Sequence, residues 1–482
     1  MKTFLWHDYE TFGANPMADR PAQFAAVRTN PELKEIGEPV TWYCSPSDDV
    51  LPHPMASLIT GITPQEAKSQ GLPETGFAAR ILEEMSQPGT CSAGYNSIRF
   101  DDTVTRNLFY RNLRDPYERE YRNGNSRWDL IDLARMCYAL RPEGIEWPMH
   151  EPGKPSFRLE DLSHANGIAH EGAHDALADV RATIGLARLL KNAQPRLFEW
   201  ALQMRDFVQA KKLLDTVEPV PVLHTSARIP ATRGCTAMVL PLAVVPDRPK
   251  SVIVFDLSAD PGPLLTEPAD VIHDLVFTSS ADLPEGIERL PLKVIHGNHV
   301  PMLAPTGTLR GVDTGRIDLD PKQCKLRAQQ ILSSLEAVRQ KVIDAFALPG
   351  EGFAESSDPD RMLYSGGFFS SADRHLMKKI LDVPPEQLGG HMWSFQDKRL
   401  PLMLFRYRAR NYPETLSQEE ARTWDKDRRS RLVETADPEY FTLSDFRATV
   451  KELRESESDR PEAQRILDKL ESWVVESGIS DL

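Results

Sequence analysis

The segment Phe4–Glu10 constrains this chain most, because it is an apolar strand pattern that ends in two acids. Side chains alternate between the two faces of a strand, so Asp8 and Glu10 point the same way. Two like charges on one face of a buried strand repel each other and are costly to desolvate. A divalent cation would offset both costs, whereas a strand end that emerges into water would avoid them. The choice between these interpretations depends on whether other acids accompany the pair.

The first ~190 residues alternate strand and helix patterns, which predicts an α/β domain. Strands are expected over 3–10, 23–29 and 39–45, and their short connections predict an antiparallel meander. Thr63 and Glu66 frame Pro64 as a capping box at the start of a helix. Further along, we expect helices over 77–86, 102–113 and 175–191 and a short strand over 91–95.

The sequence changes character after this domain. Residues 218–305 are rich in proline and in short β-branched runs, which predicts a small β domain or barrel. One long amphipathic helix is expected over 323–346, and residues 360–482 have a charged, helical pattern. A length of 482 residues is consistent with about three domains. We place their boundaries at 1–194, 195–348 and 352–482.

Composition is that of an ordinary soluble globular protein, with 27% charged and 40% hydrophobic residues. No apolar stretch approaches the ~20 residues that a membrane helix needs, so no membrane association is expected. The first residues lack the apolar core and cleavage site of a signal peptide. The five cysteines form no CxxC pair, so we expect reduced thiols in a cytoplasmic protein.

Three further polar residues stand at the starts of predicted helices. Asp101 follows Asn96 and opens the helix over 102–113, where an acid commonly caps or complements the helix dipole. His174 and Asp179 have the spacing His-x4-Asp at the start of the helix over 175–191. Asp179 faces roughly the apolar side of that helix, where packing explains an acid poorly. His174 is either a cap or surface histidine or a catalytic base.

Taken together, these residues form a set of four carboxylates and one histidine. Hard oxygen ligands in this number suit Mg²⁺ or Mn²⁺, and a two-ion site suits in-line displacement at phosphorus. A histidine with a pKa near 6.5 is suited to accept the proton of the attacking water. The sequence therefore predicts Asp8, Glu10, Asp101 and Asp179 as metal ligands and catalytic residues, with His174 as the general base.

The set resembles the motifs of the DEDDh family of 3′→5′ exonucleases. Asp8 and Glu10 match the first motif of that family, Asp101 the second, and His174 and Asp179 the third. The resemblance implies a ribonuclease H-like α/β fold with a mixed sheet. It also implies that the four acids hold two Mg²⁺ ions, which Mn²⁺ can replace, that Glu10 contacts substrate, and that the histidine is the base.

Over nearly its full length the chain resembles the bacterial exodeoxyribonuclease I branch of that family. The segments that carry this resemblance are 7–13, 99–102, 126–130, 137–145, 155–159 and 406–411. The resemblance implies that an SH3-like β domain and an all-α C-terminal domain follow the nuclease domain. It further implies release of 5′-mononucleotides from single-stranded DNA and a role in DNA repair and recombination.

Substrate contacts are expected where basic and aromatic residues alternate. The net charge of −14 argues against a polyanion as substrate, but a binding groove is a local feature. Residues 106–141 contain eight arginines and five acids with aromatics between them, and 398–410 contains five basic residues and no acid. Both stretches could bind phosphates, and their aromatics could stack on bases. Alternatively, 106–141 is a helix with solvated arginines and buried aromatics, and 398–410 is a charged strand or loop. The predicted substrate contacts are Arg106, Tyr117, Tyr121, Arg135 and Arg158, the last from the resemblance.

The resemblance also implies partners. It predicts a monomer that docks the acidic C-terminal tail of single-stranded DNA-binding protein, with Arg141 as a contact. Two alternatives remain open. A relative that acts on RNA or on polymerase errors would share all five motif residues. A non-catalytic nucleic-acid-binding scaffold is disfavoured, because a degenerate site is expected to lose acids and this one keeps them.

Overall fold

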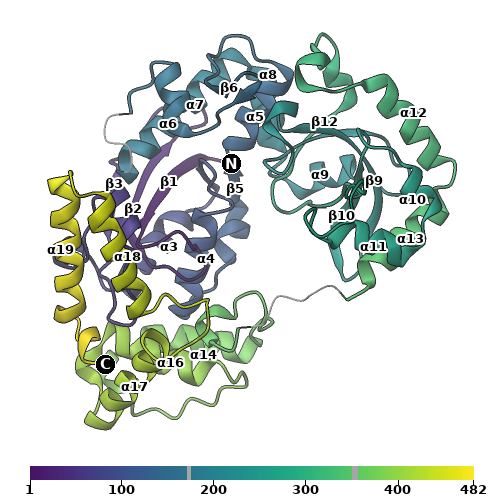
Figure 1. Cartoon of the computed structure of the whole chain (residues 1–482). Coiled ribbons are helices and arrows are strands. Elements are labelled where there is room, and N and C mark those ends of the chain that lie inside the picture. The colour runs from purple at the N-terminus through teal and green to yellow at the C-terminus, as the bar shows by residue number, and fades with distance from the viewer. Residues whose placement is uncertain (171–174, 350–355) are drawn as a thin grey trace. The chain divides into compact units, whose positions relative to one another are not determined.

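The structure is a computed structural model that describes residues 1–170, 175–349 and 356–482. The chain divides into two compact units. The first unit comprises Met1–Ser126, Glu171–Arg181 and Ala354–Leu482, and the second comprises Arg127–His170 and Ala182–Phe353. In Figure 1, the purple N-terminal strands and the yellow C-terminal helices therefore belong to one unit, although the sequence of the other unit lies between them.

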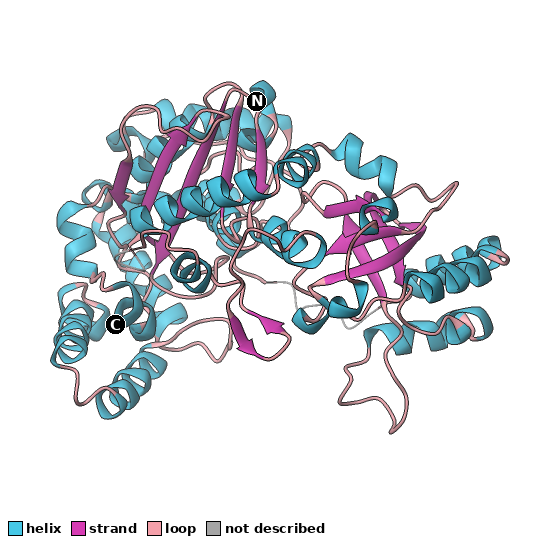
Figure 2. Cartoon of the chain, turned by 90° about the horizontal axis from the view of Figure 1, so that it is seen from above, coloured by secondary structure: helices cyan, strands magenta, loops and turns pink. Residues whose placement is uncertain are grey.

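Strand β1 (Thr3–Thr11) lies inside a mixed sheet. β2 (Pro21–Thr29) pairs antiparallel with β1, and β3 (Val40–Tyr43) pairs antiparallel with β2, which confirms the predicted meander. On the other side of β1, β4 (Thr90–Gly94) runs parallel to it. Figure 2 shows these strands in magenta, with helices around them.

Both faces of β1 are covered by other elements. Leu5 and Tyr9 pack in a core with α3 (Glu74–Met85) and α4 (Asp101–Arg111). Trp6, on the opposite face, is fully buried. A strand covered on both sides has no solvated face, so an acid near its end lies in a largely dry environment.

The C-terminal segment completes the first unit with helices. They are α14 (Ser371–Asp382), α15 (Pro385–Leu388), α16 (Leu400–Asn411), α17 (Gln418–Leu432), α18 (Leu443–Ser456) and α19 (Pro461–Glu476). Helices α18 and α19 pack against α1 (Pro54–Thr60), and Leu51 enters their core. α19 also contacts α2 (Pro64–Gln70), whose first turn Thr63 caps by accepting the Glu66 N–H.

Buried ion pairs also join the two ends of the sequence. Asp49 is fully buried between Arg20 at 3.6 Å, Arg410 at 2.8 Å and Arg431 at 3.2 Å. The basic stretch 398–410 is largely helix α16, not the strand or loop that we expected as an alternative to a DNA-binding wall. The side chains of its arginines at 406, 408 and 410 are buried and paired with acids of the same unit, because a cation inside a protein needs a counter-charge.

The second unit contains a separate antiparallel sheet, which confirms the predicted β domain. Its strands are β8 (Val222–Thr225), β9 (Thr236–Val245), β10 (Arg248–Asp256), β11 (Leu292–His296) and β12 (Met302–Pro305). They lie in the order β11-β10-β9-β8-β12. Core residues of the sheet such as Val239 and Val254 pack together with Met204 and Leu214 from the preceding helical segment.

Two predicted elements of this region were wrong. The long helix over 323–346 is interrupted, because α12 (Pro321–Leu332) ends at Ser333 and α13 (Leu335–Ala347) starts after Ser334, whose backbone leaves the helical region. Serine favours such helix ends. Within 218–305, the short apolar runs Val271-Ile272 and Leu275-Val276-Phe277, which we counted as β-type, lie instead in helix α11 (Ala269–Phe277), where Ile272 and Val276 are the buried residues at helical spacing.

The remaining strands and helices are distributed over both units. They are β5 (Ser126–Asp129), α5 (Ile131–Leu140), β6 (Met149–Glu151), β7 (Lys154–Pro155), α6 (Leu159–Ala165), α7 (Ala176–Ala193), α8 (Pro195–Gln203), α9 (Phe207–Leu213) and α10 (Gly262–Thr266). Within the described residues, no helix has both the length and the apolar character needed to cross a membrane.

Candidate metal centre

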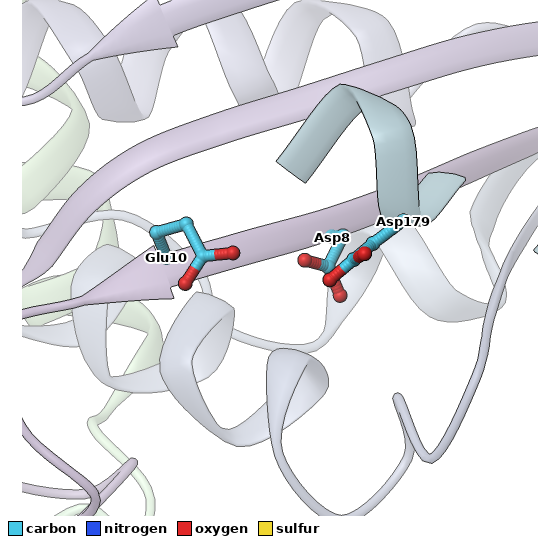
Figure 3. Close-up of side chains that lie close together, drawn as sticks. All are labelled: Asp8, Glu10 and Asp179. Atoms are coloured by element: carbon cyan, nitrogen blue, oxygen red, sulfur yellow. The ribbon is translucent and has the colours of Figure 1, made fainter. Parts of the chain in front are cut away.

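Three carboxylates meet near the end of β1. Asp8 and Glu10 project from one face of the strand, as their spacing predicted, and Asp179 projects from the first turn of α7 (Figure 3). One oxygen from each of the three lies within 4.8 Å of the others. Glu10 is buried, and Asp8 and Asp179 are partly exposed. This arrangement provides three hard oxygen ligands around one point.

Asp101 lies next to this cluster. It is the first residue of α4 and only 3% exposed, and its Oδ1 accepts the backbone N–H of Tyr9 at 3.0 Å. β4 pairs with Thr3–Trp6 of β1 and ends at Gly94, so β1 continues beyond the end of β4. A side chain just beyond the carboxyl end of a parallel strand is a common position for a functional residue in α/β sheets.

The turn between β4 and α4 depends on a glycine. A Cβ on Gly94 would lie 2.9 Å from the carbonyl oxygen of His7 and 2.7 Å from Cβ of Ser97, which is too close for any other residue. Asn96 follows with a φ of 61°, a left-handed conformation that asparagine tolerates better than most residues. This tight turn brings Asp101 back to the end of β1.

Two side chains accept hydrogen bonds from the backbone at the start of α7. Oδ1 of Asp175 accepts the N–H of Ala178 at 3.0 Å, so it caps the helix. Oε1 of Gln23 on β2 accepts the N–H of Ala176 at 3.3 Å. Gln23 is also the cross-strand partner of Glu10, and the β1–β2 register shifts immediately after that pair. Irregularities of this kind re-aim side chains and are frequent beside functional sites.

The carboxylates of the cluster disfavour each other's charge. Burial raises the pKa of Asp8 well above its ordinary value, and the negative charges of Asp101 and Asp179 raise it further. Burial likewise raises the pKa of Glu10 to about 9, with contributions from Asp8, Asp179 and Asp175. A bound cation would reverse this effect by stabilising the ionised forms. The donor set and its electrostatics therefore both fit a divalent metal.

The predicted base, His174, lies outside the described residues. Asp175, its neighbour in sequence, is a residue that our sequence analysis missed. It caps α7 and contributes to the raised pKa of Glu10. An aspartate immediately before a predicted helix was the available signal, because aspartate is a preferred helix cap.

Models of three protein domains match consecutive parts of the chain. Residues 5–187 match a model described as Exonuclease, 205–348 the Exonuclease I SH3-like domain, and 357–477 the Exonuclease I C-terminal domain. Exodeoxyribonuclease I of Escherichia coli is 49% identical over 427 residues, which cover 89% of each protein. The Haemophilus influenzae protein of the same name is 43% identical over 474 residues, 98% of each. The chain belongs to the exonuclease I family.

Solved structures of the exonuclease I family have the same fold. E. coli exonuclease I in complex with a dA16 oligonucleotide has a TM-score of 0.93 at 45% identity and covers 99% of this chain and 100% of its own. A zinc-bound E. coli exonuclease I–single-stranded DNA complex has a TM-score of 0.92 at 45% identity, covering 99% of each chain. A structure of SSB/exonuclease I with the inhibitor CFAM has a TM-score of 0.89 at 44% identity, covering 99% and 100%.

These matches confirm the predicted organisation of an exonuclease domain with a mixed sheet, an SH3-like domain and a helical C-terminal domain. The segment that matches the Exonuclease model, residues 5–187, does not coincide with one compact unit. It is divided between the two units, and the unit that contains β1 also contains the C-terminal helices. The boundaries 1–194, 195–348 and 352–482 stay predictions.

Three predicted substrate contacts lie in the first unit. The guanidinium of Arg106 donates to both carboxylate oxygens of Glu120, at 2.7 and 3.0 Å, and lies 5.4 Å from the ring centre of Tyr117. Tyr121 is 67% exposed. Arg106 is thus held in place by an acid, while Tyr121 presents its ring to solvent.

The other predicted contacts lie in the second unit. Arg135 pairs with Asp132 at 2.6 Å, and its guanidinium lies over the ring of Phe157 at 5.7 Å. Arg158 is exposed and lies 3.5 Å from Glu160. The guanidinium of Arg141 donates to backbone carbonyls, including that of Thr308 at 3.0 Å. The roles of all these residues in substrate or partner binding stay predictions.

Beside Tyr117, the first unit contains a cavity of about 630 Å³ that joins residues of 110–125 to residues of 363–381. Tyr117 and Phe368 line it with their rings edge to face at 6.2 Å, and Phe368 is 86% exposed. Arg374 and Lys378 add positive charge to the lining. Our sequence analysis missed the contribution of residues 363–381 to this cavity, because no local pattern relates residues so far apart in the chain.

Proposed function

We propose that this chain is a metal-dependent exonuclease that removes 5′-mononucleotides from the 3′ ends of single-stranded DNA. The observation that carries the proposal is the convergence of Asp8, Glu10 and Asp179 beside Asp101 in a member of the exonuclease I family. Burial and neighbouring carboxylates raise the pKa of Asp8 and of Glu10, so this grouping of acids has little structural value, whereas it forms a suitable site for cations.

The metal is proposed to be Mg²⁺, as two ions, with Mn²⁺ as a substitute. All four proposed ligands are carboxylates, the donor type that these hard cations prefer, and the zinc-bound E. coli structure supports a divalent site in the family. When bound, the ions would lower the pKa of a water molecule and stabilise the leaving 3′ oxygen.

The protein's own groups have distinct proposed roles. His174 precedes Asp179 by five residues and would accept the proton of the attacking water. Glu10 has a second role in contacting the 3′-terminal nucleotide, and Arg158 would bind a phosphate. Replacing His174 with alanine should remove the base but leave metal affinity nearly unchanged.

Single-stranded DNA is supported as substrate by the cavity that Tyr117 and Phe368 line. The ring of Phe368 is exposed, and Tyr117 is partly buried beside it. An exposed ring stacks on an unpaired base without sequence preference, and nearby cations attract the phosphates. Arg374 and Lys378 supply such cations at the same cavity, although the whole chain is acidic. The dA16 complex of the E. coli relative agrees with this substrate class.

A time course with a 5′-labelled oligonucleotide tests the proposal. Single-stranded DNA with Mg²⁺ should give a ladder of products that shorten from the 3′ end. Double-stranded DNA, and single-stranded DNA with EDTA, should stay intact. Equal hydrolysis of RNA, loss of label from the 5′ end as the first event, or turnover in EDTA would each contradict the proposal.

We further propose that the protein acts as a monomer in the cytoplasm in DNA repair and recombination, with single-stranded DNA-binding protein as partner. The SSB/exonuclease I structure supports this partner. Arg141 is the proposed contact for the acidic C-terminal tail. An Arg141→Ala variant should bind a fluorescent tail peptide more weakly and retain hydrolysis of naked oligonucleotides; unchanged peptide affinity would exclude this contact.

A further inference from the structure

Gln23 connects three elements of the first unit at one point. It lies on β2, where its cross-strand partners are Glu10 on β1 and Tyr43 on β3. Its side chain is nearly inaccessible, with 2% exposure. Oε1 accepts the N–H of Ala176 at 3.3 Å. This buried amide therefore links β2 to the start of α7.

The hydrogen bond to Ala176 matters because of what the helix carries. The first N–H groups of a helix have no partner within the helix and need an external acceptor. Ala176 is the first residue of α7, and Asp179 follows it by three residues, which is less than one turn. Any shift or fraying of this first turn moves the Asp179 carboxylate directly.

Gln23 also lies next to the partner carboxylates. Because Gln23 is opposite Glu10, the bond to Ala176 fixes α7 relative to the strand pair that holds Asp8 and Glu10. Replacement of Gln23 by an apolar residue would leave one N–H of α7 buried without this acceptor, a state that proteins avoid by local rearrangement.

We propose that Gln23 is a positioning residue of the metal centre: it fixes the start of α7 on β2 so that Asp179 stays within ligand distance of Asp8 and Glu10. The proposal rests on the proposed metal-dependent function. Gln23 contacts neither metal nor DNA in this role. Groups that orient metal ligands typically contribute ten- to a hundredfold to metal affinity or activity.

Three variants of the full chain separate this role from general stability. Gln23→Leu removes the acceptor at similar volume, and Gln23→Glu keeps an acceptor oxygen. Thr29→Val is the matched control, because Thr29 is a fully buried residue at the other end of β2 whose Oγ1 accepts the indole Nε1–H of Trp6 at 3.0 Å. Each variant is measured for Mn²⁺ affinity by electron paramagnetic resonance, for kcat and KM on a single-stranded oligonucleotide, and for melting temperature.

We expect Gln23→Leu to weaken Mn²⁺ binding and to lower kcat, each by about tenfold, with KM for DNA unchanged. Gln23→Glu should retain both within about threefold. Thr29→Val should lower the melting temperature without changing metal affinity or kcat. If Gln23→Leu matches Thr29→Val in metal affinity and kcat, Gln23 has a structural role only and the proposal is overturned.

A further variant tests the Gln23–Ala176 hydrogen bond from the side of the helix. Ala176→Pro removes the N–H donor at the first helical position, where proline is well tolerated. It should reproduce the Gln23→Leu defect, and the two changes combined should cost no more than either alone. Additive defects would overturn the proposal. If wild-type protein neither binds Mn²⁺ nor hydrolyses DNA, the proposed function itself fails, a result distinct from wild-type activity that Gln23 variants leave unchanged.

Discussion

At the scale of single residues, the metal centre is a set of acids placed where ionisation is unfavourable. Burial is the largest cause of the raised pKa values of Asp8 and Glu10, and the neighbouring carboxylates add to it. With a pKa of about 9, Glu10 holds a proton at neutral pH in the metal-free protein. Metal binding at Glu10 would release this proton, so metal affinity and pH are linked.

The first prediction concerns the stability of the metal-free protein. The pKa of Glu10 in the folded state is about 9, above the ordinary carboxyl value, so the folded state binds a proton more tightly than the unfolded state. This contribution is complete below the unfolded pKa of about 4.3 and is lost as pH rises toward 9. As the pH is raised from about 4.3 to 9 in EDTA, the melting temperature of the wild-type protein should fall more than that of Glu10→Gln. Mg²⁺ should reverse this difference. Parallel melting curves for the two proteins would contradict the prediction.

The second prediction concerns the ligands themselves. Asp8→Asn and Asp179→Asn each remove a proposed metal ligand and should lower kcat by roughly a thousandfold or more. The affinity for single-stranded DNA, measured by anisotropy in EDTA, should stay within about threefold of wild type because phosphate contacts lie elsewhere. Glu336→Gln, at a surface ion pair with Arg339, is the control that should retain activity. Turnover near wild type in either asparagine variant would remove the metal assignment.

At the scale of elements, α16 shows how tertiary contacts decide the meaning of a basic segment. Its charged residues face acids from distant parts of the chain, among them Asp49 and Asp360. Burial alone would raise the pKa of Asp49, but Arg410, Arg20 and Arg431 outweigh it and hold this pKa well below its usual range. The helix is thus a structural connector between the first and last parts of the sequence.

The third prediction is that Asp49→Asn destabilises the protein by about 3–5 kcal/mol, because it leaves buried arginines without their shared counter-charge. Urea unfolding at pH 7 measures this change. The depressed pKa of Asp49 means that its contribution is present above the ordinary carboxyl pKa and is lost as pH falls through the folded-state value. The difference between wild type and Asp49→Asn should therefore shrink only in strong acid. A cost no larger than that of the exposed Glu336→Gln change, about 1 kcal/mol or less, would show that the network adds nothing.

At the scale of the whole molecule, the ends of the sequence form one unit. The N–H of Thr75 donates to Oδ1 of Asn411 at 2.9 Å, and the hydroxyls of Thr75 and Tyr407 lie 3.0 Å apart. Leu51 packs with Phe446 and Leu470. The N-terminal part therefore depends on residues at the far end of the chain for its core and for its buried polar groups.

The fourth prediction follows from this dependence. A chain truncated after residue 349 should lose cooperative melting and bind a hydrophobic dye, because apolar surface and the arginine partners of Asp49 are both removed. Removal of residues 481–482 alone, which leaves the buried Ile479 in place, is the control and should have a much smaller effect. Soluble yield, dye fluorescence and calorimetry measure the difference. A truncated chain that melts like wild type would show that the N-terminal part folds alone.

The features that sequence reasoning predicted are local ones. The same-face placement of Asp8 and Glu10, the cap at Thr63 and the position of Asp179 in the first turn of a helix all follow from spacings of a few residues. Such spacings report backbone periodicity directly. Predictions failed where periodicity was ambiguous, as in the interrupted helix at Ser333 and the short helix that contains Ile272 and Val276.

From the sequence by itself, the types and order of the acids predicted a divalent-metal site and a family. The tertiary structure alone decided how these residues are placed: α4 begins beyond the end of β4 and carries Asp101, Gln23 links β2 to α7, and Asp49 pairs with distant arginines. Neighbouring residues determine local backbone geometry. Contacts between residues hundreds of positions apart arise from burial and charge compensation, which leave no periodic signal in the sequence.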